Sequence, residues 1–172
     1  TLIRDSKKMT DLQRETAFAW IMEHCTTGVG IVSHTVIDEE GILTATERAM
    51  QQAVEHLSRT LRPTYLLVDG RDKFWFDIPH TSIVGGDDQE ACIAAASIVA
   101  KVTRDRLMCE EAQKYPQYGF ERHKGYAAPT HIDMLRTHGP CPIHRMRFLR
   151  NILASVTTPC VDAPTPTAER PQ

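Results

Sequence analysis

Residues 93–106 read Ile-Ala-Ala-Ala-Ser-Ile-Val-Ala-Lys-Val-Thr-Arg-Asp-Arg, and the interpretation of the whole chain starts from this stretch. Its first half is small and apolar, which is typical of a helix that packs closely against a neighbouring element. Its second half is densely charged, so this end of the helix would face something anionic. Glycines at 85–86 precede the stretch and Pro116 follows it, which predicts a long helix over residues 88–113.

Helices alternate with short apolar strands on both sides of this long helix. Such alternation predicts an α/β layer architecture with one domain over residues 1–152. Residues 153–172 are rich in Thr and Pro, and we expect a disordered tail there. Small and apolar side chains would let the long helix lie closely on the sheet: Ala94, Ala95, Ile98 and Val102. The other predicted helices cover residues 10–25, 42–57, a short stretch after Pro129 and 144–154, and the predicted strands cover residues 28–33, 65–69 and 78–84.

The composition is that of a soluble globular protein, with 172 residues of which 41% are hydrophobic. No apolar run approaches the roughly 18–20 residues needed to cross a bilayer, and no signal-peptide pattern is present. The five cysteines are odd in number and irregularly spaced. This pattern favours free thiols in a reducing cytoplasm over a disulfide framework or a zinc site. Nothing in the sequence indicates an oligomer, so a monomer is expected.

The net charge of −2 conceals an asymmetry along the chain. Residues 1–100 hold 9 Lys and Arg against 15 Asp and Glu, whereas residues 101–150 hold 10 against 5. A basic segment beside an acidic one suits a protein that holds a polyphosphate with one part and metal ions with the other. The alternative is a chance distribution of charge on a solvated surface.

Two aspartates are candidate metal ligands. Asp69 follows the apolar run 65–68, and an acid at the carboxyl end of a buried strand lies where α/β proteins collect their active sites. Asp87 follows the turn at 85–86, at the start of the long helix. Two such carboxylates can share a hard divalent cation, which prefers oxygen ligands. The ordinary alternatives are an Asp-Gly turn for Asp69 and a helix N-cap for Asp87.

Several polar side chains are candidates for binding nucleic acid. A basic loop with an aromatic side chain, as at Lys124 and Tyr126, can hold a phosphate and stack on a sugar or base. The alternative for Tyr126 is a place at the edge of the core. The other candidates for phosphate contact, each of which could equally be an ordinary surface group, are Lys7, Lys8, Ser97 and Lys101.

The segments just described resemble ribonuclease HII, the type 2 ribonuclease H that cuts RNA strands paired with DNA. The resemblance covers roughly residues 2–148 in register. It rests on the long-helix stretch together with Asp-Ser-Lys-Lys-Met at 5–9, Tyr-Leu-Leu-Val-Asp-Gly at 65–70, Gly-Asp at 86–87, Tyr-Gly-Phe at 118–120, His-Lys-Gly-Tyr at 123–126, Gly-Pro at 139–140 and Pro-Ile-His-Arg at 142–145.

The resemblance implies a ribonuclease H-like fold, with a mixed sheet flanked by helices and a helical carboxyl-terminal part. It implies an endonuclease that acts on RNA–DNA hybrids and cuts 5′ of ribonucleotides embedded in duplex DNA, in ribonucleotide removal and primer processing. Asp69 and Asp87 would be its third and fourth catalytic carboxylates, and Tyr126 would recognise the RNA–DNA junction. Two Mg²⁺ or Mn²⁺ ions roughly 4 Å apart would activate a water and stabilise the leaving 3′-oxygen.

The sequence also departs from the family pattern. Bacterial members usually read Lys-Gly-Asp where this chain has Gly85-Gly86-Asp87, which removes one cation near the metal site. The family opens with a strand reading Gly-(Ile/Val)-Asp-Glu-(Ala/Val)-Gly-Arg-Gly, which supplies the other two carboxylates. These 172 residues do not contain that motif, so we expect an amino-terminally incomplete copy that is inactive alone. The alternatives are a non-catalytic nucleic-acid-binding remnant and a chain that does not fold stably.

Overall fold

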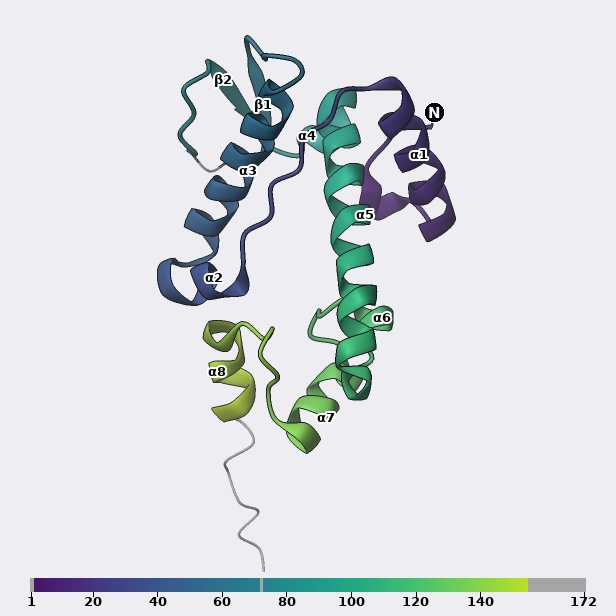
Figure 1. Ribbon diagram of the computed structural model, residues 1–172, viewed down its shortest axis with the longest axis vertical. Coiled ribbons are helices and arrows are strands. Elements are labelled where there is room, and N and C mark those ends of the chain that lie inside the picture. The colour runs from purple at the N-terminus through teal and green to yellow at the C-terminus, as the bar shows by residue number, and fades with distance from the viewer. Residues whose placement is uncertain (1, 72, 155–172) are drawn as a thin grey trace, which may run out of the picture.

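A computed structural model describes residues 2–71 and 73–154. The long helix α5 (Ala91–Lys114) runs along most of the long axis of the molecule (Figure 1). A separate short helix, α4 (Gly86–Gln89), precedes it. Glu90 lies between the two helices in an extended conformation (φ −123°, ψ 121°). The predicted helix over residues 88–113 is therefore present, but it is interrupted at its start.

The amino-terminal half of α5 packs against α1 (Asp11–His24). A capping box begins α1, because the Thr10 side chain accepts from the Gln13 N–H and the Gln13 side chain accepts from the Thr10 N–H. Apolar side chains from both helices and from Met9 form a buried cluster: Met9, Ala17, Ile21, Ile98, Val99 and Val102. We predicted that this face of α5 would lie on the sheet. Ile98 and Val102 instead pack in the α1 cluster, while α5 contacts β1 less extensively.

A second cluster forms around the carboxyl-terminal half of α5. Short elements follow that helix: η2 (Pro116–Tyr118), α6 (Phe120–His123), α7 (Pro129–His138) and α8 (Met146–Ala154). The buried members of the cluster are Ala112, Tyr118, Phe120, Leu135 and Leu149. The predicted helices after Pro129 and near residues 144–154 are confirmed, whereas α6 was not predicted.

The sheet of the described residues consists of two parallel strands, β1 (Leu66–Asp69) and β2 (His80–Ile83). Leu66 lies opposite His80, and Asp69 lies opposite Ile83. The carboxyl ends of both strands therefore meet at one edge, and the chain leaves β2 at that edge to enter α4. Two helices lie between α1 and the sheet in the chain: α2 (His34–Glu40), which was not predicted, and α3 (Ile42–Ser58), which was.

The predicted strand over residues 28–33 is wrong, because this segment is extended but pairs with no strand in the described part of the chain. Its backbone N–H groups donate to side chains of α3 instead. Val29 N–H donates to His56 Nδ1 at 3.2 Å, and Ile31 N–H donates to Gln52 Oε1 at 3.1 Å. The alternation of glycine with apolar residues thus serves close packing on a helix rather than sheet pairing.

The helix α8 is the last element of the described residues. The expected tail begins at residue 153, but α8 continues to Ala154. The rest of the predicted tail, residues 155–172, lies outside the described residues. No helix within residues 2–71 and 73–154 combines the length and apolarity needed to span a membrane.

A methyl group at residue 30 tests the packing of this segment on α3. The Cβ atom of Gly30→Ala would lie 1.9 Å from the Ala49 carbonyl oxygen and 2.8 Å from the Ala53 nitrogen, so the backbone must move apart. We expect the free energy of unfolding to fall by about 1–3 kcal/mol, measured by urea denaturation. Thr26→Ala, at an exposed neighbouring position, is the control and should change it little. Equal stability of the two variants would contradict the close approach.

Candidate active site

Two aspartates meet where the sheet ends and α4 begins. Asp69 is the last residue of β1, and its Oδ1 accepts a hydrogen bond of 2.9 Å from the Gly86 N–H. Asp87 is the next residue after Gly86 and is only 6% exposed. Gly85 precedes them in the left-handed conformation (φ 65°, ψ 38°), which favours glycine. Neither α4 nor α5 has a side-chain N-cap, so the alternative of an N-cap role for Asp87 is wrong.

Lys7 lies beside both carboxylates. Its Nζ donates to Asp87 Oδ2 at 3.1 Å. The pKa of Lys7 is raised, first by this hydrogen bond and by the charge of Asp87, with smaller contributions from Asp5 and Asp69. The Lys7 side chain is 77% exposed, whereas Asp87 is buried. The lysine predicted to contact phosphate is thus paired with a predicted metal ligand.

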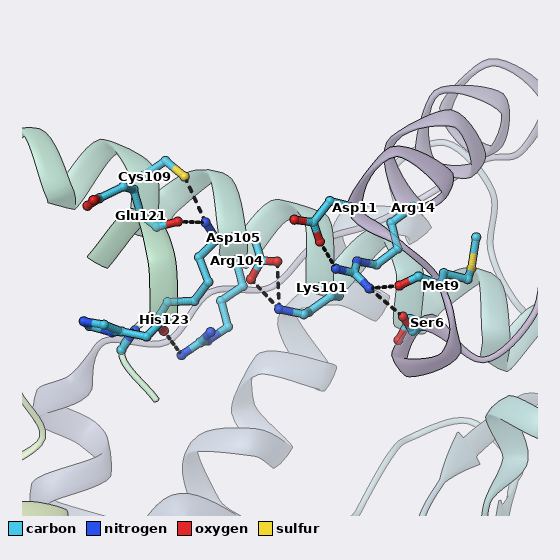
Figure 2. Close-up of polar contacts among 12 residues, drawn as sticks. Ser6, Met9, Asp11, Arg14, Lys101, Arg104, Asp105, Cys109, Glu121 and His123 are labelled. Carbon is cyan, nitrogen blue, oxygen red and sulfur yellow. Dashed lines mark hydrogen bonds and ion pairs between the residues drawn. The ribbon is translucent and has the colours of Figure 1, made fainter. Parts of the chain in front are cut away.

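The rest of the loop 5–9 is fixed to α4, α5 and α1. Lys8 Nζ pairs with Asp88 Oδ1 at 2.6 Å, and Ser6 Oγ lies 2.9 Å from Ser97 Oγ. Arg14 of α1 donates from Nη1 to the carbonyl oxygens of Ser6 and Met9 (Figure 2). The structure therefore brings together five of the predicted site residues: Asp69, Asp87, Lys7, Lys8 and Ser97.

Arg14 and Asp88 were missed as members of this site. Arg14 was missed because its contacts are made with main-chain atoms of a preceding loop, which no side-chain motif reveals. Asp88 was not singled out in the sequence, yet its carboxylate binds Lys8. Asp5 holds the loop in shape, since its side chain accepts from the Lys7 N–H, and this hydrogen bond lowers the pKa of Asp5.

A second group of predicted residues lies further along α5, around Tyr126. The Arg104 guanidinium lies 4.7 Å from the centre of the Tyr126 ring, and Lys101 Nζ lies 5.6 Å from it. Lys101 also forms an ion pair with Asp105 at 2.6 Å (Figure 2). Arg104 donates to the Lys124 carbonyl oxygen at 2.8 Å. Tyr126 itself is 55% exposed, so its ring is available to a ligand.

The loop that carries Lys124 depends on two residues with positive φ. Lys124 (φ 51°) and Gly125 (φ 76°) both adopt the left-handed region, which turns the chain sharply after α6. A Cβ atom on Gly125 would lie 3.3 Å from Met108 Cε, so the loop lies closely on α5. The Lys124 ammonium contacts the Glu121 carbonyl oxygen and, at 3.3 Å, Cys109 Sγ. Cys109 is itself exposed.

A divalent metal ion fits these residues only in part. Carboxylate oxygens are its preferred ligands, and Asp69 and Asp87 supply two such groups. Within residues 2–71 and 73–154, however, no three His, Cys, Asp or Glu side chains converge into a metal-binding group. Lys7 also neutralises one of the two negative charges. The described residues therefore fit as part of the coordination of an ion, but not as a complete two-ion site.

A family model for ribonuclease HII matches residues 2–151. Ribonuclease HII from Acetivibrio thermocellus is 46% identical over 152 residues, which make up 88% of this chain and 59% of that protein. Ribonuclease HII from Bacillus mycoides is 48% identical over 147 residues, or 85% of this chain and 56% of that protein. The chain thus spans less than two thirds of the length of either relative.

Solved structures establish the fold. The crystal structure of the ribonuclease H2 from Pyrococcus horikoshii OT3 matches with a TM-score of 0.66 and 24% identity, over 90% of this chain and 81% of that chain. The fold and the site together define a ribonuclease H-like α/β protein, which confirms the predicted fold class. The sequence matches are more specific, and they show that the chain belongs to the ribonuclease HII family.

The Lys7–Asp87 ion pair predicts how a substitution of Lys7 changes the affinity for a metal ion. In Lys7→Gln the positive charge beside Asp87 is lost, so Mn²⁺ should bind up to about fivefold more tightly, since an ion pair whose lysine is 77% exposed is screened by water and contributes roughly 0.2–1 kcal/mol. Titration followed by Mn²⁺ electron paramagnetic resonance measures this affinity. Lys8→Gln, whose partner is Asp88, is the matched control and should have little effect. Unchanged or weaker binding in Lys7→Gln would show that the ion and Lys7 do not share Asp87.

A buried histidine pair predicts acid sensitivity. His131 and His144 are 4% and 7% exposed, and burial lowers the pKa of both. The nearby charged or titratable groups are His123, Arg145 and Cys141. Below the ordinary histidine pKa of about 6.5, the unfolded chain takes up protons that the folded chain does not, so stability is present above that pH and lost below it.

Thermal unfolding between pH 7.5 and 5 measures this loss, which is limited to about 1.4 kcal/mol per pH unit for each histidine. In His144→Gln the slope of stability against pH should be shallower than in the natural sequence, because one depressed pKa is removed. His24→Gln, at an exposed histidine on α1, should leave the slope unchanged. Identical slopes in all three proteins would contradict neutral burial of the pair.

Proposed function

We propose that this chain works in an endoribonuclease that hydrolyses the RNA strand of RNA–DNA hybrids and cuts 5′ of ribonucleotides embedded in duplex DNA. The observation that carries the proposal is the Gly86–Asp69 hydrogen bond, which holds the Asp69 carboxylate at the start of α4, next in the chain to Asp87, whose own carboxylate pairs with the Lys7 ammonium. This arrangement occurs in a chain whose residues 2–151 match the ribonuclease HII family. An acidic centre bordered by lysines suits a phosphodiester held against metal ions.

The proposed roles divide between the two groups of residues. Asp69 and Asp87 bind Mg²⁺ or Mn²⁺, which in the family's chemistry supplies an activated water and stabilises the leaving oxygen. Lys7, Lys8 and Ser97 contact the phosphate next to the cut. Each is bound to another side chain in the structure, and Lys7 and Lys8 are more than half exposed, so they can exchange these partners for phosphate oxygens.

Lys101, Lys124 and Tyr126 are proposed to contact the substrate further along its strand. Ser97 and Arg104 are seven residues apart on α5, which is about 10 Å along a helix axis. This distance corresponds to about three nucleotide steps of 3.4 Å each. The excess of positive charge over residues 101–150 supports contact with a polyanion on this side of the molecule. Tyr126 offers an exposed ring on which a sugar or base can stack.

The balance of charge at the acidic site argues against cutting by the 172-residue chain alone. Two divalent ions bring a charge of +4, whereas Asp69 and Asp87 offer −2 and Lys7 cancels one of these charges. We therefore expect the chain to bind substrate without measurable cutting. We also infer that it acts as a monomer. The cysteines that the structure describes are free thiols, which supports a reducing compartment such as the cytoplasm.

The second candidate function is a nucleic-acid-binding module without catalysis. It is favoured by the Lys7–Asp87 ion pair, which leaves a neutral pair where an ion would bind. In that case Lys7 and Tyr126 would still contact a duplex, but divalent ions would neither bind tightly nor lead to cutting.

A cleavage assay separates the two functions. The substrate is a labelled DNA duplex with one ribonucleotide, in Mg²⁺ or Mn²⁺. The 172-residue chain is compared with a fusion that places the Asp-Glu strand motif expected from the family pattern before Thr1. We expect binding without cutting by the chain, and cutting 5′ of the ribonucleotide by the fusion.

Asp69→Asn in the fusion is the matched control. Its amide oxygen can still accept from the Gly86 N–H, so the fold should persist while cutting falls by at least about a thousandfold. Cutting by the chain as given would overturn the charge argument. Binding by the fusion without cutting would favour the non-catalytic module.

A further inference from the structure

A chain of hydrogen bonds between histidine side chains ends at the main chain of Tyr126. The Cys141 N–H donates to His144 Nδ1 at 2.9 Å. His144 Nε2 lies 3.1 Å from His131 Nε2, and this contact is buried. His131 Nδ1 lies 2.8 Å from the Tyr126 carbonyl oxygen. These atoms come from α7, from the loop before α8 and from the loop after α6.

The donors and acceptors determine which nitrogen carries each proton. The Cys141 N–H can only donate, so His144 Nδ1 accepts and the proton of neutral His144 lies on Nε2. His144 Nε2–H then donates to His131 Nε2, which leaves the proton of His131 on Nδ1. That proton is donated to the Tyr126 carbonyl oxygen, which can only accept. This assignment gives every contact in the chain one donor and one acceptor.

One competing contact does not change the assignment. The Cys141 carbonyl oxygen lies 3.2 Å from His144 Nδ1, but it already accepts from the His144 N–H at 3.0 Å. A proton on Nδ1 would face the Cys141 N–H and leave that group without an acceptor. The neighbouring His123 is set in the same way, since it accepts from the Gly125 N–H at Nδ1 and donates from Nε2 to the Tyr118 carbonyl oxygen.

Packing holds His131 in the orientation that this chain requires. Its ring stacks on His123 with a centroid distance of 4.3 Å and an interplanar angle of 11°. The Phe120 ring meets it edge-on at 5.5 Å and 80°. With 4% exposure, His131 has no water with which to exchange its hydrogen bonds freely. The direction of its Nδ1–H bond is therefore fixed.

Hydrogen bonds hold the Tyr126 main chain at both its carbonyl oxygen and its N–H group. Its carbonyl oxygen accepts from the Ala128 N–H at 2.8 Å as well as from His131, and its own N–H donates to the His123 carbonyl oxygen at 2.9 Å. Arg104 binds the Lys124 carbonyl oxygen two residues earlier. The exposed ring thus projects over Lys101 and Arg104 from a backbone with few remaining degrees of freedom.

We propose that His131, held in one tautomer by His144, is a positioning residue that fixes the Tyr126 ring for recognition of a ribonucleotide in duplex DNA. The proposal rests on the proposed function for its substrate. It extends that function to two buried histidines that lie behind the Tyr126 main chain. A preorganised ring loses less conformational entropy on binding, so affinity for the ribonucleotide should depend on a buried side chain behind it.

Nuclear magnetic resonance of ¹⁵N-labelled histidine tests the hydrogen-bond chain without any substrate. In long-range ¹H–¹⁵N spectra at pH 7.5, His131 should show the Nδ1–H tautomer, and His144 and His123 the Nε2–H tautomer. An Nε2–H tautomer at His131, or rapid exchange between its two tautomers, would overturn the proposal.

Binding assays with a matched pair of variants test whether His131 positions Tyr126 for recognition of the substrate. An asparagine amide can take the place of His131 Nδ1–H and donate to the Tyr126 carbonyl oxygen, whereas phenylalanine keeps the ring volume and cannot donate. The chain, His131→Asn and His131→Phe are titrated into a duplex with one ribonucleotide and into the same duplex made only of DNA. Circular dichroism monitors whether each variant folds.

The preference for the ribonucleotide duplex should fall by about fivefold in His131→Phe, as expected for the loss of one hydrogen bond, and persist in His131→Asn. Equal preference in His131→Phe and the natural chain would overturn the positioning role, as would equal loss in both variants. If the natural chain binds both duplexes equally, the proposed function fails, and the positioning role fails with it. In that case the nuclear magnetic resonance measurement of the histidine tautomers still tests the hydrogen-bond chain by itself.

Discussion

Burial of one face of α5 against α1 is the constraint on which both parts of the site depend. Ile98 and Val102 are 0% and 3% exposed, and they fix the rotation of α5 about its axis. Once that rotation is fixed, the helical repeat determines where Ser97 and Lys101 point. Ser97 then meets the loop 5–9, and Lys101 meets Tyr126. Loss of a large side chain in this interface costs roughly 2–5 kcal/mol, so the site and the stability of the fold depend on the same contacts.

The two partners of the ion pair in the acidic site, Asp87 and Lys7, differ in their exposure to solvent. Asp87 is buried and held by its place in α4, while the Lys7 side chain that neutralises it is largely exposed. A lysine in this position can leave Asp87 at little cost, because water solvates its ammonium and the ion pair is weak. Under the proposed function, an ion that binds Asp87 would replace Lys7 as its cation, and the freed lysine would then be available to a phosphate.

The sequence predicted those parts of the structure that depend on short-range patterns. Asp69 and Asp87 were found because a strand end and a glycine turn are local signals, and the parallel register of β1 with β2 brings them to one edge. The extended segment 28–33 was misassigned because alternation cannot tell a strand from a chain that packs on a helix. Its hydrogen-bond partners, His56 and Gln52, lie more than twenty residues away.

Asp38 was missed for a related reason. Its sequence context is that of a solvated charge, but its two carboxylate oxygens accept from the Met146 and Arg147 N–H groups at 2.9 and 2.8 Å. A residue of α2 therefore caps the first turn of α8, 108 positions away in sequence from Met146. Burial opposes ionisation of Asp38, but these hydrogen bonds outweigh it and lower its pKa. No local pattern contains that information.

The same long-range contacts determine how the Tyr126 loop is supported. Asp38 holds the start of α8, the loop before α8 carries Cys141 and His144, and His144 leads through His131 to Tyr126. The steps from Cys141 to Tyr126 are hydrogen bonds of buried or partly buried groups, whereas the two hydrogen bonds of Asp38 are exposed. The main-chain loop between α7 and α8 joins these two sets of contacts. The Tyr126 loop is therefore supported by α7 and by the loop before α8, and Asp38 of α2 holds the far end of that second loop.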